Sequence, residues 1–215
     1  MCGRFALINN PLLLMSLFDL PPEEGFRPVY NIAPSFRVLA AYREDQDIVL
    51  GRKAWNFKPH WAKKDMKAVI NARTETAFEK PYFRSAIKKH RCLIPATGFY
   101  EWKSPEAGQK GKTPVFIHPE NLEEGFLLGG VFEGDGLAIC TREATERMKP
   151  IHDRMPVIVP PDATEAWLRS EDRSEISRII DSSLDVDHAY PVSTDVNSPA
   201  QDSPELLEPS GNPFF

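Results

Sequence analysis

The first residues of the chain, Met1-Cys2-Gly3-Arg4, offer chemistry that no internal stretch can supply. If Met1 is removed, Cys2 carries a thiol and a free α-amine on adjacent carbons. With unperturbed pKa values near ~8 for the amine and ~8.5 for the thiol, both are partly nucleophilic at neutral pH. The amine can condense with an aldehyde to an imine, and the thiol can then close a five-membered thiazolidine. Alternatively, position 2 simply holds a small residue after an initiator methionine.

Two titratable residues could supply a general acid and a general base. Glu101 lies between Tyr100 and Trp102 after an apolar strand, and apolar surroundings raise the pKa of a carboxyl group towards useful values. His152, next to Asp153, could be a general acid oriented by a carboxylate. A salt-bridged glutamate and a structural histidine are the alternatives. The residues alone favour these structural roles.

Polar and cationic residues form a second set. Asn71 and Arg73 are two positions apart, so they share one face if their segment is a strand. They could reach into a site together or make hydrogen bonds at a strand end. Arg4 would bring a permanent cation, a natural phosphate contact, close to Cys2, unless it forms a surface ion pair. Trp61 either stacks a nucleobase or packs a loop.

Composition excludes several classes of protein. The chain has 215 residues, of which 41% are hydrophobic and 27% charged, as in an ordinary globular domain. No apolar run reaches the ~20 residues of a membrane span. The three cysteines have no C-x-x-C spacing, so we expect no disulfide framework, no metal site and no cofactor, and we expect Cys92 and Cys140 to be inert core residues. A reducing cytoplasm is the predicted compartment, with nucleoid association if the source is bacterial.

The net charge of −5 hides an asymmetry along the chain. Residues 52–91 contain twelve Lys and Arg against three Asp and Glu, whereas residues 162–208 contain three against twelve. A basic segment that also holds Trp55, Trp61 and Phe83 could bind a phosphate backbone and stack bases. A solvated face of scattered lysines is an equal alternative. For the acidic segment, solubility is preferred over mimicry of DNA.

Hydrophobic patterning predicts more strands than helices, without regular alternation between them. We therefore expect a single α+β domain with a mostly antiparallel, barrel-like folded sheet and flanking helices. The domain should cover residues 1–200, and residues 201–215 should form an extended or mobile tail. Strands are expected at 5–9, 36–41, 48–50, 91–96, 99–103, 115–117, 126–132 and 137–141, and helices at 11–18, 83–89, 163–168 and 176–180. Thr74 or Thr76 could cap the second of these helices.

Five blocks in order make the chain resemble the SOS response-associated peptidase (SRAP) family. They are Met1-Cys2-Gly3-Arg4-Phe5, Tyr30-Asn31-Ile32-Ala33-Pro34, Ile70-Asn71-Ala72-Arg73-Thr74-Glu75-Thr76, Arg91-Cys92-Leu93-Ile94-Pro95-Ala96 with Gly98-Phe99-Tyr100-Glu101-Trp102, and Ile151-His152-Asp153-Arg154-Met155-Pro156. The blocks run from residue 1 to about residue 159. One departure is the loop that usually begins Trp-Gly and here reads Trp55-Asn56, where Asn could keep a left-handed turn.

The resemblance implies a sensor of abasic sites in single-stranded DNA. Such proteins crosslink to the lesion through a thiazolidine at the mature N-terminal cysteine. Carried over, Cys2 is the nucleophile, Asn71 orients it, Glu101 is the acid and base, and His152 assists opening of the deoxyribose ring. The DNA-contacting positions carried over are Arg4, Arg73, His60 and Trp61. The resemblance also implies autocatalytic loss of Met1, and the imine chemistry permits a weak abasic-site lyase activity.

Other functions compete with this interpretation. An N-terminal-nucleophile glutamine amidotransferase also begins Met-Cys-Gly and uses its α-amine as a base, but it has no obvious use for the basic segment. A non-covalent DNA- or protein-binding module would leave Cys2 incidental. A peptidase acting in trans would need a second nucleophile with a convincing base. The expected partner is single-stranded DNA with abasic sites, bound by a monomer without a membrane.

Overall fold

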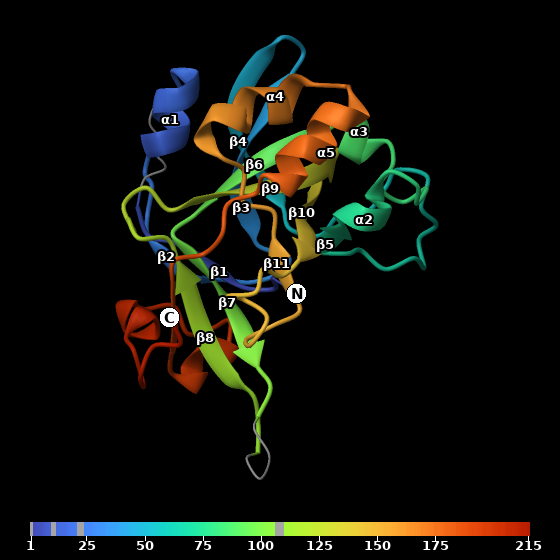
Figure 1. Ribbon diagram of the computed structural model, residues 1–215. Coiled ribbons are helices and arrows are strands. Elements are labelled where there is room, and N and C mark those ends of the chain that lie inside the picture. Colours follow the sequence, from blue (N-terminus) through green and yellow to red (C-terminus); the bar gives the residue numbers. More distant parts are fainter. Residues whose placement is uncertain (1, 10–11, 21–23, 106–109) are drawn as a thin grey trace.

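A ring of strands forms the centre of the protein. The computed structural model describes residues 2–9, 12–20, 24–105 and 110–215. The ring strands are β3 (Arg37–Glu44), β4 (Asp47–Ala54), β6 (Arg91–Ala96), β9 (Phe126–Glu133) and β10 (Gly136–Glu143). Their order is β10-β4-β3-β6-β9, and β9 pairs again with β10, which closes the ring (Figure 1). This confirms the predicted barrel-like, mostly antiparallel sheet.

Two hairpins, β3–β4 and β9–β10, and one parallel contact between β4 and β10 set the registers of this ring. The β3–β4 hairpin pairs Arg37 with Ala54 and Glu44 with Asp47, and Asp45 takes a φ of 52° in its turn. Asp is one of the few non-glycine residues that accept this left-handed conformation. The strands β4 and β10 share the single parallel pair Gly136 and Ala54. The segment after β4 continues this contact through Phe57, whose N–H donates to the Leu137 carbonyl at 2.9 Å.

A smaller sheet carries the N-terminus. It contains β1 (Phe5–Leu7), β2 (Val29–Ile32), β7 (Gly98–Lys103), β8 (Thr113–His118) and β12 (His188–Pro191), in the order β12-β8-β7-β1-β2. The short strands β5 (Asn71–Arg73) and β11 (Arg154–Pro156) attach to β10 of the ring. Gly98 must be glycine, because a Cβ there would lie 2.5 Å from the Phe116 ring and 2.6 Å from the Ile117 carbonyl oxygen. This close approach of β7 to β8 fixes the strand that carries Glu101.

The helices are short and lie around the ring. They are α1 (Leu12–Phe18), α2 (Thr74–Ala77), α3 (Ala86–Lys89), α4 (Thr164–Arg169) and α5 (Arg173–Asp181), with 3-10 helices η1 (Pro161–Ala163), η2 (Thr194–Asn197) and η3 (Pro204–Leu207). In Figure 1, α3, α4 and α5 lie over the ring strands, and the β7–β8 hairpin extends away from them. Among the helices of the described residues, none is both long and apolar enough to cross a membrane.

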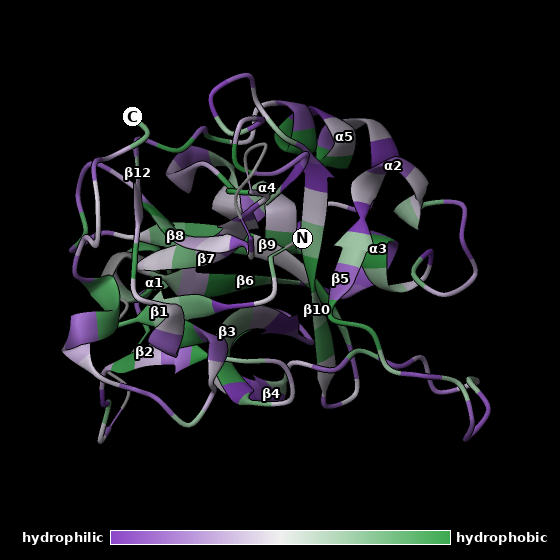
Figure 2. Ribbon diagram, turned by 90° about the horizontal axis from the view of Figure 1, so that it is seen from below, coloured by the Kyte–Doolittle hydropathy of each residue, from purple (hydrophilic) through white to green (hydrophobic). Residues whose placement is uncertain are grey.

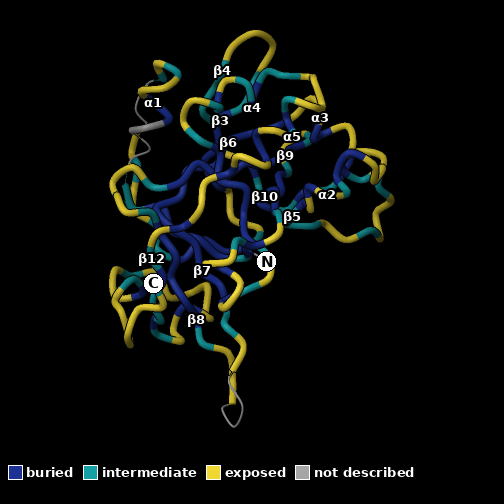
Figure 3. The backbone as a smooth tube through the Cα atoms, viewed as in Figure 1, coloured by how far each residue is buried: buried dark blue, intermediate teal, exposed yellow. Residues whose placement is uncertain are grey.

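The core has two main clusters because the ring is covered on both faces. One cluster unites side chains of the two sheets, among them Phe5, Ile94 and Phe99. The other lies between the ring and the helices and includes Leu93 and Trp167. Adjacent residues of β6 thus face different clusters, and all of β6 is buried. Figures 2 and 3 show the consequence: β6 and β9 are apolar and buried, whereas β4 is largely half-buried and most connections are polar and exposed.

Some local expectations from the sequence were wrong. The helix expected over residues 83–89 shortens to α3, and Thr74 and Thr76 do not cap it. Thr74 instead begins α2, and its hydroxyl donates to the Thr141 carbonyl at 3.1 Å, because α2 lies against β10. Asn56 does not take the left-handed turn. The helix start expected at residue 11 lies outside the described residues.

The last residues are mostly exposed and contact the rest of the protein at a few points. Within the stretch 201–215, expected to be extended or mobile, η3 buries Leu206. The Phe214 N–H donates to the Ala189 carbonyl at 2.7 Å, and the Ala189 N–H donates to the Phe215 carbonyl at 3.2 Å. The tail therefore follows the edge of β12, where it satisfies backbone groups that an edge strand leaves open.

Candidate active site and nucleic-acid interface

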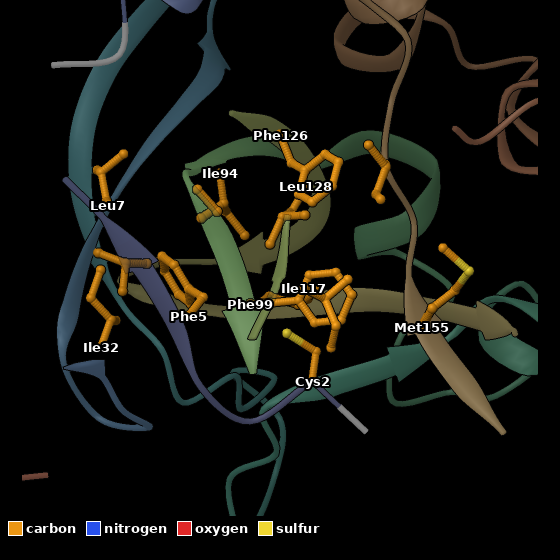
Figure 4. Packing of buried hydrophobic residues seen from close by; sticks show 14 of the residues in the cluster. Cys2, Phe5, Leu7, Ile32, Ile94, Phe99, Ile117, Phe126, Leu128 and Met155 are labelled. Carbon is orange, nitrogen blue, oxygen red and sulfur yellow. The ribbon is translucent and has the colours of Figure 1, made fainter. Parts of the chain in front are cut away.

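Cys2 lies in the interior of the protein, at the point where both sheets meet. Its side chain is fully buried and belongs to the apolar cluster with Phe99 and Ile117 (Figure 4). Burial, reinforced by the negative charge of Glu101, raises the pKa of the Cys2 thiol far above its usual range. The thiol is therefore protonated at neutral pH. In this protonated form the sulfur is a weak nucleophile.

Asn71 holds the backbone of Cys2. Its side-chain amide donates to the Cys2 carbonyl at 2.9 Å and to its own neighbour, the Ile70 carbonyl, also at 2.9 Å. The strand β5 places Asn71 there because it pairs in parallel with β10, with Asn71 opposite Ile139. The structure thus brings together two residues that are 69 positions apart. This contact fixes the Cys2 backbone.

Glu101 and His152 face each other beside Cys2. Glu101 is 2% exposed, and its Oε2 lies 3.9 Å from Nε2 of His152. Burial raises the pKa of Glu101, and the positive charge of Lys112 opposes that rise. Burial also lowers the pKa of His152, and the charge of Lys112 acts in the same direction. At neutral pH the imidazole is therefore neutral, next to a carboxyl that holds its proton to a higher pH than an exposed one would.

The turn after His152 orients its ring. The backbone N–H of Arg154 donates to Nδ1 at 3.0 Å, which leaves the proton of a neutral ring on Nε2, the nitrogen that faces Glu101. The Asp153 carboxylate also lies 2.8 Å from Nδ1 and competes for it when the ring is protonated. Because the Asp153 side chain is 86% exposed, the Arg154 N–H is the steadier partner.

Sequence reasoning missed the ion pair that joins this turn to β5. The Arg154 guanidinium bonds both carboxylate oxygens of Glu75, at 2.7 and 2.9 Å, and the Thr141 carbonyl at 2.8 Å. Glu75 stands four positions after Asn71, so the pair ties the Asn71 strand to the His152 turn. The signal was present, since both residues belong to blocks that carry the family resemblance. Lys112, from the polar loop before β8, had no such signal.

Arg4 has structural partners. Its guanidinium donates to the Asn31 side-chain oxygen and to the Val196 carbonyl, both at 2.7 Å, and lies 6.0 Å from the ring centre of Trp102. It is 9% exposed. Arg4 therefore fastens β1 to β2 and η2, and its DNA contact stays a prediction.

A groove of about 380 Å³ begins at Asn71. Arg73, Lys80 and Thr76 supply its polar lining, and Val69 and Phe83 belong to its apolar lining. A second hollow of about 440 Å³ is lined by Trp61, Pro81, Arg84 and Ser85. Both are lined by the chain after β4 and by the turn before α3. Together the linings of these two grooves, which we call the basic path, supply the cations Arg73, Lys80 and Arg84 and the rings of Trp61 and Phe83. Cations and aromatic rings are the groups that bind single-stranded nucleic acid.

Trp61 and His60 stand on the connection between β4 and β5. Trp61 is 49% exposed and meets the Tyr82 ring edge-on at 6.1 Å between centres. The backbone N–H of His60 donates to Glu133 at 3.0 Å, and the His60 ring pairs with the same carboxylate. The structure thus brings Cys2, Asn71, Glu101 and His152 together, whereas Trp61 lines the second hollow and His60 precedes it in the chain.

The other two cysteines lie in the core of the protein. Cys92 and Cys140 are fully buried, as predicted, and burial raises the pKa of the Cys140 thiol to about 12. Within the described part of the chain, no group of three or more His, Cys, Asp or Glu side chains could hold a metal ion.

Comparison with known proteins places this geometry in a family. The sequence model of the SOS response associated peptidase (SRAP) family matches residues 1–199. "Abasic site processing protein YoqW" of Bacillus subtilis is 37% identical over 226 residues, covering 97% of this chain and 99% of the relative. "Abasic site processing protein YedK" of Escherichia coli is 30% identical, with 97% and 100% covered. A crystal structure of a Bacteroides thetaiotaomicron protein shares the fold, with a TM-score of 0.79, 22% identity, and coverage of 97% and 100%.

Proposed function

The chain belongs to the SRAP family, and from this membership and the site's geometry we propose that it senses abasic sites in single-stranded DNA and captures them covalently through Cys2. The observation that carries the proposal is the convergence of four residues from distant segments on one point. Cys2 is held by Asn71, and Glu101 lies 3.9 Å from His152 beside it. An N-terminal amine at that point would meet an acid and a neutral base.

Loss of Met1 comes first. Hydrolysis of the Met1–Cys2 peptide bond consumes one water, releases methionine and frees the Cys2 α-amine. In the proposal the site performs this step itself. A Glu101 carboxylate takes the proton of the attacking water and then returns it to the departing nitrogen. Asn71 holds the Cys2 carbonyl during this step.

Capture of the lesion then follows in three stages. His152 helps to open the closed deoxyribose, which frees the C1′ aldehyde. The Cys2 amine adds to C1′, and protonated Glu101 donates to the departing oxygen, so that one water leaves and an imine forms. Finally the Cys2 sulfur adds to C1′, and its proton moves to the former imine nitrogen. The net change is one C–N bond and one C–S bond formed, with one water lost.

The buried thiol sets the order of these stages. Because its pKa is raised by burial, the sulfur waits protonated while the amine reacts. Once the imine forms on the adjacent nitrogen, the electrophilic carbon lies within reach of a five-membered ring closure. The apolar cluster around Cys2 also shields the sulfur from oxidants before that moment. The same shelter then protects the finished thiazolidine.

A strand of DNA would lie along the basic path. In the proposal Arg73 and Lys80 bind phosphates close to Asn71, and Trp61 stacks a base farther along, with His60 beside it. The Nη1 atom of Arg4 already donates to Asn31 and Val196, and in the proposal its other N–H groups donate to a phosphate near Cys2. The protein acts as a monomer in the cytoplasm. Base identity matters little to it, because the target base is absent.

Intact mass spectrometry tests the proposal. The purified protein should lack Met1, and after incubation with an abasic single-stranded oligonucleotide its mass should rise by that of the oligonucleotide minus one water. Peptide mapping should place the bond at Cys2. Retention of Met1, or a crosslink at another side chain, would overturn the proposal. Release of ammonia from glutamine by the same preparation would point to the amidotransferase instead.

Replacement of the sulfur separates the imine from the finished ring. In Cys2→Ser the amine still forms the imine, but an oxygen ring is less stable than the sulfur one. We expect the stable adduct on a denaturing gel to disappear. Strand cleavage should increase, because a lingering imine permits loss of the C2′ proton and expulsion of the 3′ phosphate. Borohydride should trap the imine of this variant, and a Cys2→Ser adduct as stable as that of the natural chain would contradict this order of steps.

A further inference from the structure

A second groove, separate from the basic path, opens where the start of β9 meets the segment after β11. It has a volume of about 340 Å³ and shares no lining residue with the two grooves of the basic path. Phe126, Leu127, Ile158 and Val159 belong to its apolar lining. None of the residues proposed to capture the lesion lines it. A volume of this size accommodates one or two large side chains.

Leu184 stands at the groove in a fixed position. It is 43% exposed, one of few large hydrophobic side chains with that exposure among the described residues. Its backbone N–H donates to the Ile158 carbonyl at 2.9 Å, and the Ser183 hydroxyl accepts the Ile158 N–H at 2.8 Å. The backbone at Leu184 is thus held at the rim by hydrogen bonds to Ile158, which lines the groove. An exposed apolar side chain on a hydrogen-bonded backbone, next to an apolar hollow, is typical of an interaction site.

The rim is acidic. Glu120, Glu124, Asp185 and Asp187 line it, and no Lys or Arg is among its lining residues. Asp185 accepts hydrogen bonds from Thr145 and from the backbone N–H of Val186, so its carboxylate is held in place.

Nearby cations neutralise this rim only in part. Glu120 pairs with His188, and Asp187 accepts the backbone N–H of Glu120. The guanidinium groups of Arg142 and Arg147 bind backbone carbonyls of the neighbouring segment, at Ser183 and Val186. Four carboxylates around one hollow, with these two arginines beside them, leave the rim negative.

We propose that this groove binds a segment of another protein in which a large aliphatic or aromatic side chain stands between lysines or arginines. The apolar side chain would enter the hollow against Leu184, and the flanking cations would meet Glu124 and Asp187. Because the rim is negatively charged, it would repel the phosphates of DNA, so DNA is excluded as the occupant. The binding energy of such a small contact comes mainly from the central apolar anchor, and the charges supply specificity and the association rate.

Fluorescence anisotropy with a defined peptide tests this surface. The probe is a labelled octapeptide with a central Leu-Phe pair flanked on both sides by lysines. We expect saturable binding that weakens with salt. Leu184→Ser should weaken it about tenfold, the loss expected from leaving one apolar side chain unburied. Glu124→Lys should also weaken it, and both variants should keep the Tm and the crosslinking rate of the natural chain.

Matched controls separate the groove from general attraction to an acidic protein. Leu17→Ser changes another exposed leucine, on α1, and Glu208→Lys changes another exposed acid, and both should keep full affinity. A peptide with glutamates in place of the lysines should not bind. Equal affinity of Leu184→Ser and the natural chain would overturn the proposal. So would sedimentation that shows a dimer lost in Leu184→Ser, since the occupant would then be a second copy of this chain.

Discussion

At the scale of single residues, the buried carboxyl of Glu101 shows that a group proposed for catalysis can lower the stability of the fold. Burial raises the pKa of this carboxyl, so the folded protein binds its proton more tightly than the unfolded chain does. Stability is therefore lost as the pH rises from the unfolded pKa through the raised folded one. A charged Glu101 in the folded protein therefore costs stability, and in the proposal this carboxyl serves as the acid and base of the reaction.

Glu101→Gln should accordingly change activity and stability in opposite directions. We expect crosslinking to an abasic oligonucleotide to slow by about 10²–10⁴-fold, the usual contribution of a positioned acid or base. The Tm at pH 7 should rise or stay level, because a neutral amide needs no charge in the interior. Stopped samples on denaturing gels give the rate, and calorimetry gives the Tm. A normal crosslinking rate would remove Glu101 from the mechanism.

The proposal gives His152 a narrower task, opening of the sugar ring. Its pKa is lowered by burial, so the neutral ring persists to a lower pH than that of an exposed histidine, and the Arg154 N–H fixes its tautomer. We expect His152→Ala to slow capture of a natural abasic site about 10²-fold. The same variant should react at the normal rate with an oligonucleotide that carries an open-chain aldehyde, which needs no ring opening. An equal loss on both substrates would assign His152 to a later step.

At the scale of elements, the pair Glu75–Arg154 connects the parts of the site. Glu75 is 41% exposed and Arg154 is 11% exposed, so the bond is partly shielded from solvent. Burial raises the pKa of Glu75, but the bonds to Arg154 outweigh this and the net pKa is lowered. The pair therefore stabilises the fold above the unfolded pKa of the carboxyl and is lost as the pH falls through the folded one.

Glu75→Gln should loosen the link between β5 and the His152 turn. We expect a loss of about 1 kcal/mol in the free energy of unfolding. Crosslinking should be about tenfold slower, because the ion pair that connects the segments of Asn71 and His152 is lost. Affinity for intact single-stranded DNA should not change. Glu146→Gln is the control, since the Glu146–Lys149 pair is 90% and 53% exposed and should contribute little. A tenfold loss of DNA affinity in Glu75→Gln would show that Glu75 acts on binding.

The elements also show which features a sequence can predict. Strands with clear apolar runs, such as β6 and β9, were placed nearly to the residue, because burial on both faces leaves an unbroken hydrophobic signal. The short α2 and α3 were misjudged, since four-residue helices have too little periodicity. The motifs suggested Asn71 and Glu101, and the family resemblance related both to Cys2, but only the fold shows the hydrogen bond from Asn71 to the Cys2 carbonyl. No local pattern indicates that Lys112 acts on Glu101 and His152, because that proximity comes from the β7–β8 hairpin.

At the scale of the whole molecule, basic and acidic residues line separate grooves. The basic segment 52–91 supplies the lining of both grooves on the basic path, and acidic residues from the 120s and 180s surround the apolar groove. A net charge of −5 therefore does not prevent DNA binding, because the strand meets only the local field. The acidic rim would repel a strand that strayed from its path.

The salt dependence of the affinity for single-stranded DNA tests whether the strand binds the basic grooves. For single-stranded DNA the slope of log K against log salt is about −0.7 for each phosphate neutralised, so Arg73→Gln and Lys80→Gln should each make the slope shallower by about 0.7. Trp61→Ala should lower affinity by about 1–3 kcal/mol at every salt concentration and leave the slope unchanged, because stacking releases no counterions. Lys149→Gln removes an exposed cation that lines neither groove and should change neither quantity. If Arg73→Gln and Lys80→Gln leave the slope unchanged but Lys149→Gln makes it shallower, the DNA strand binds another face of the protein.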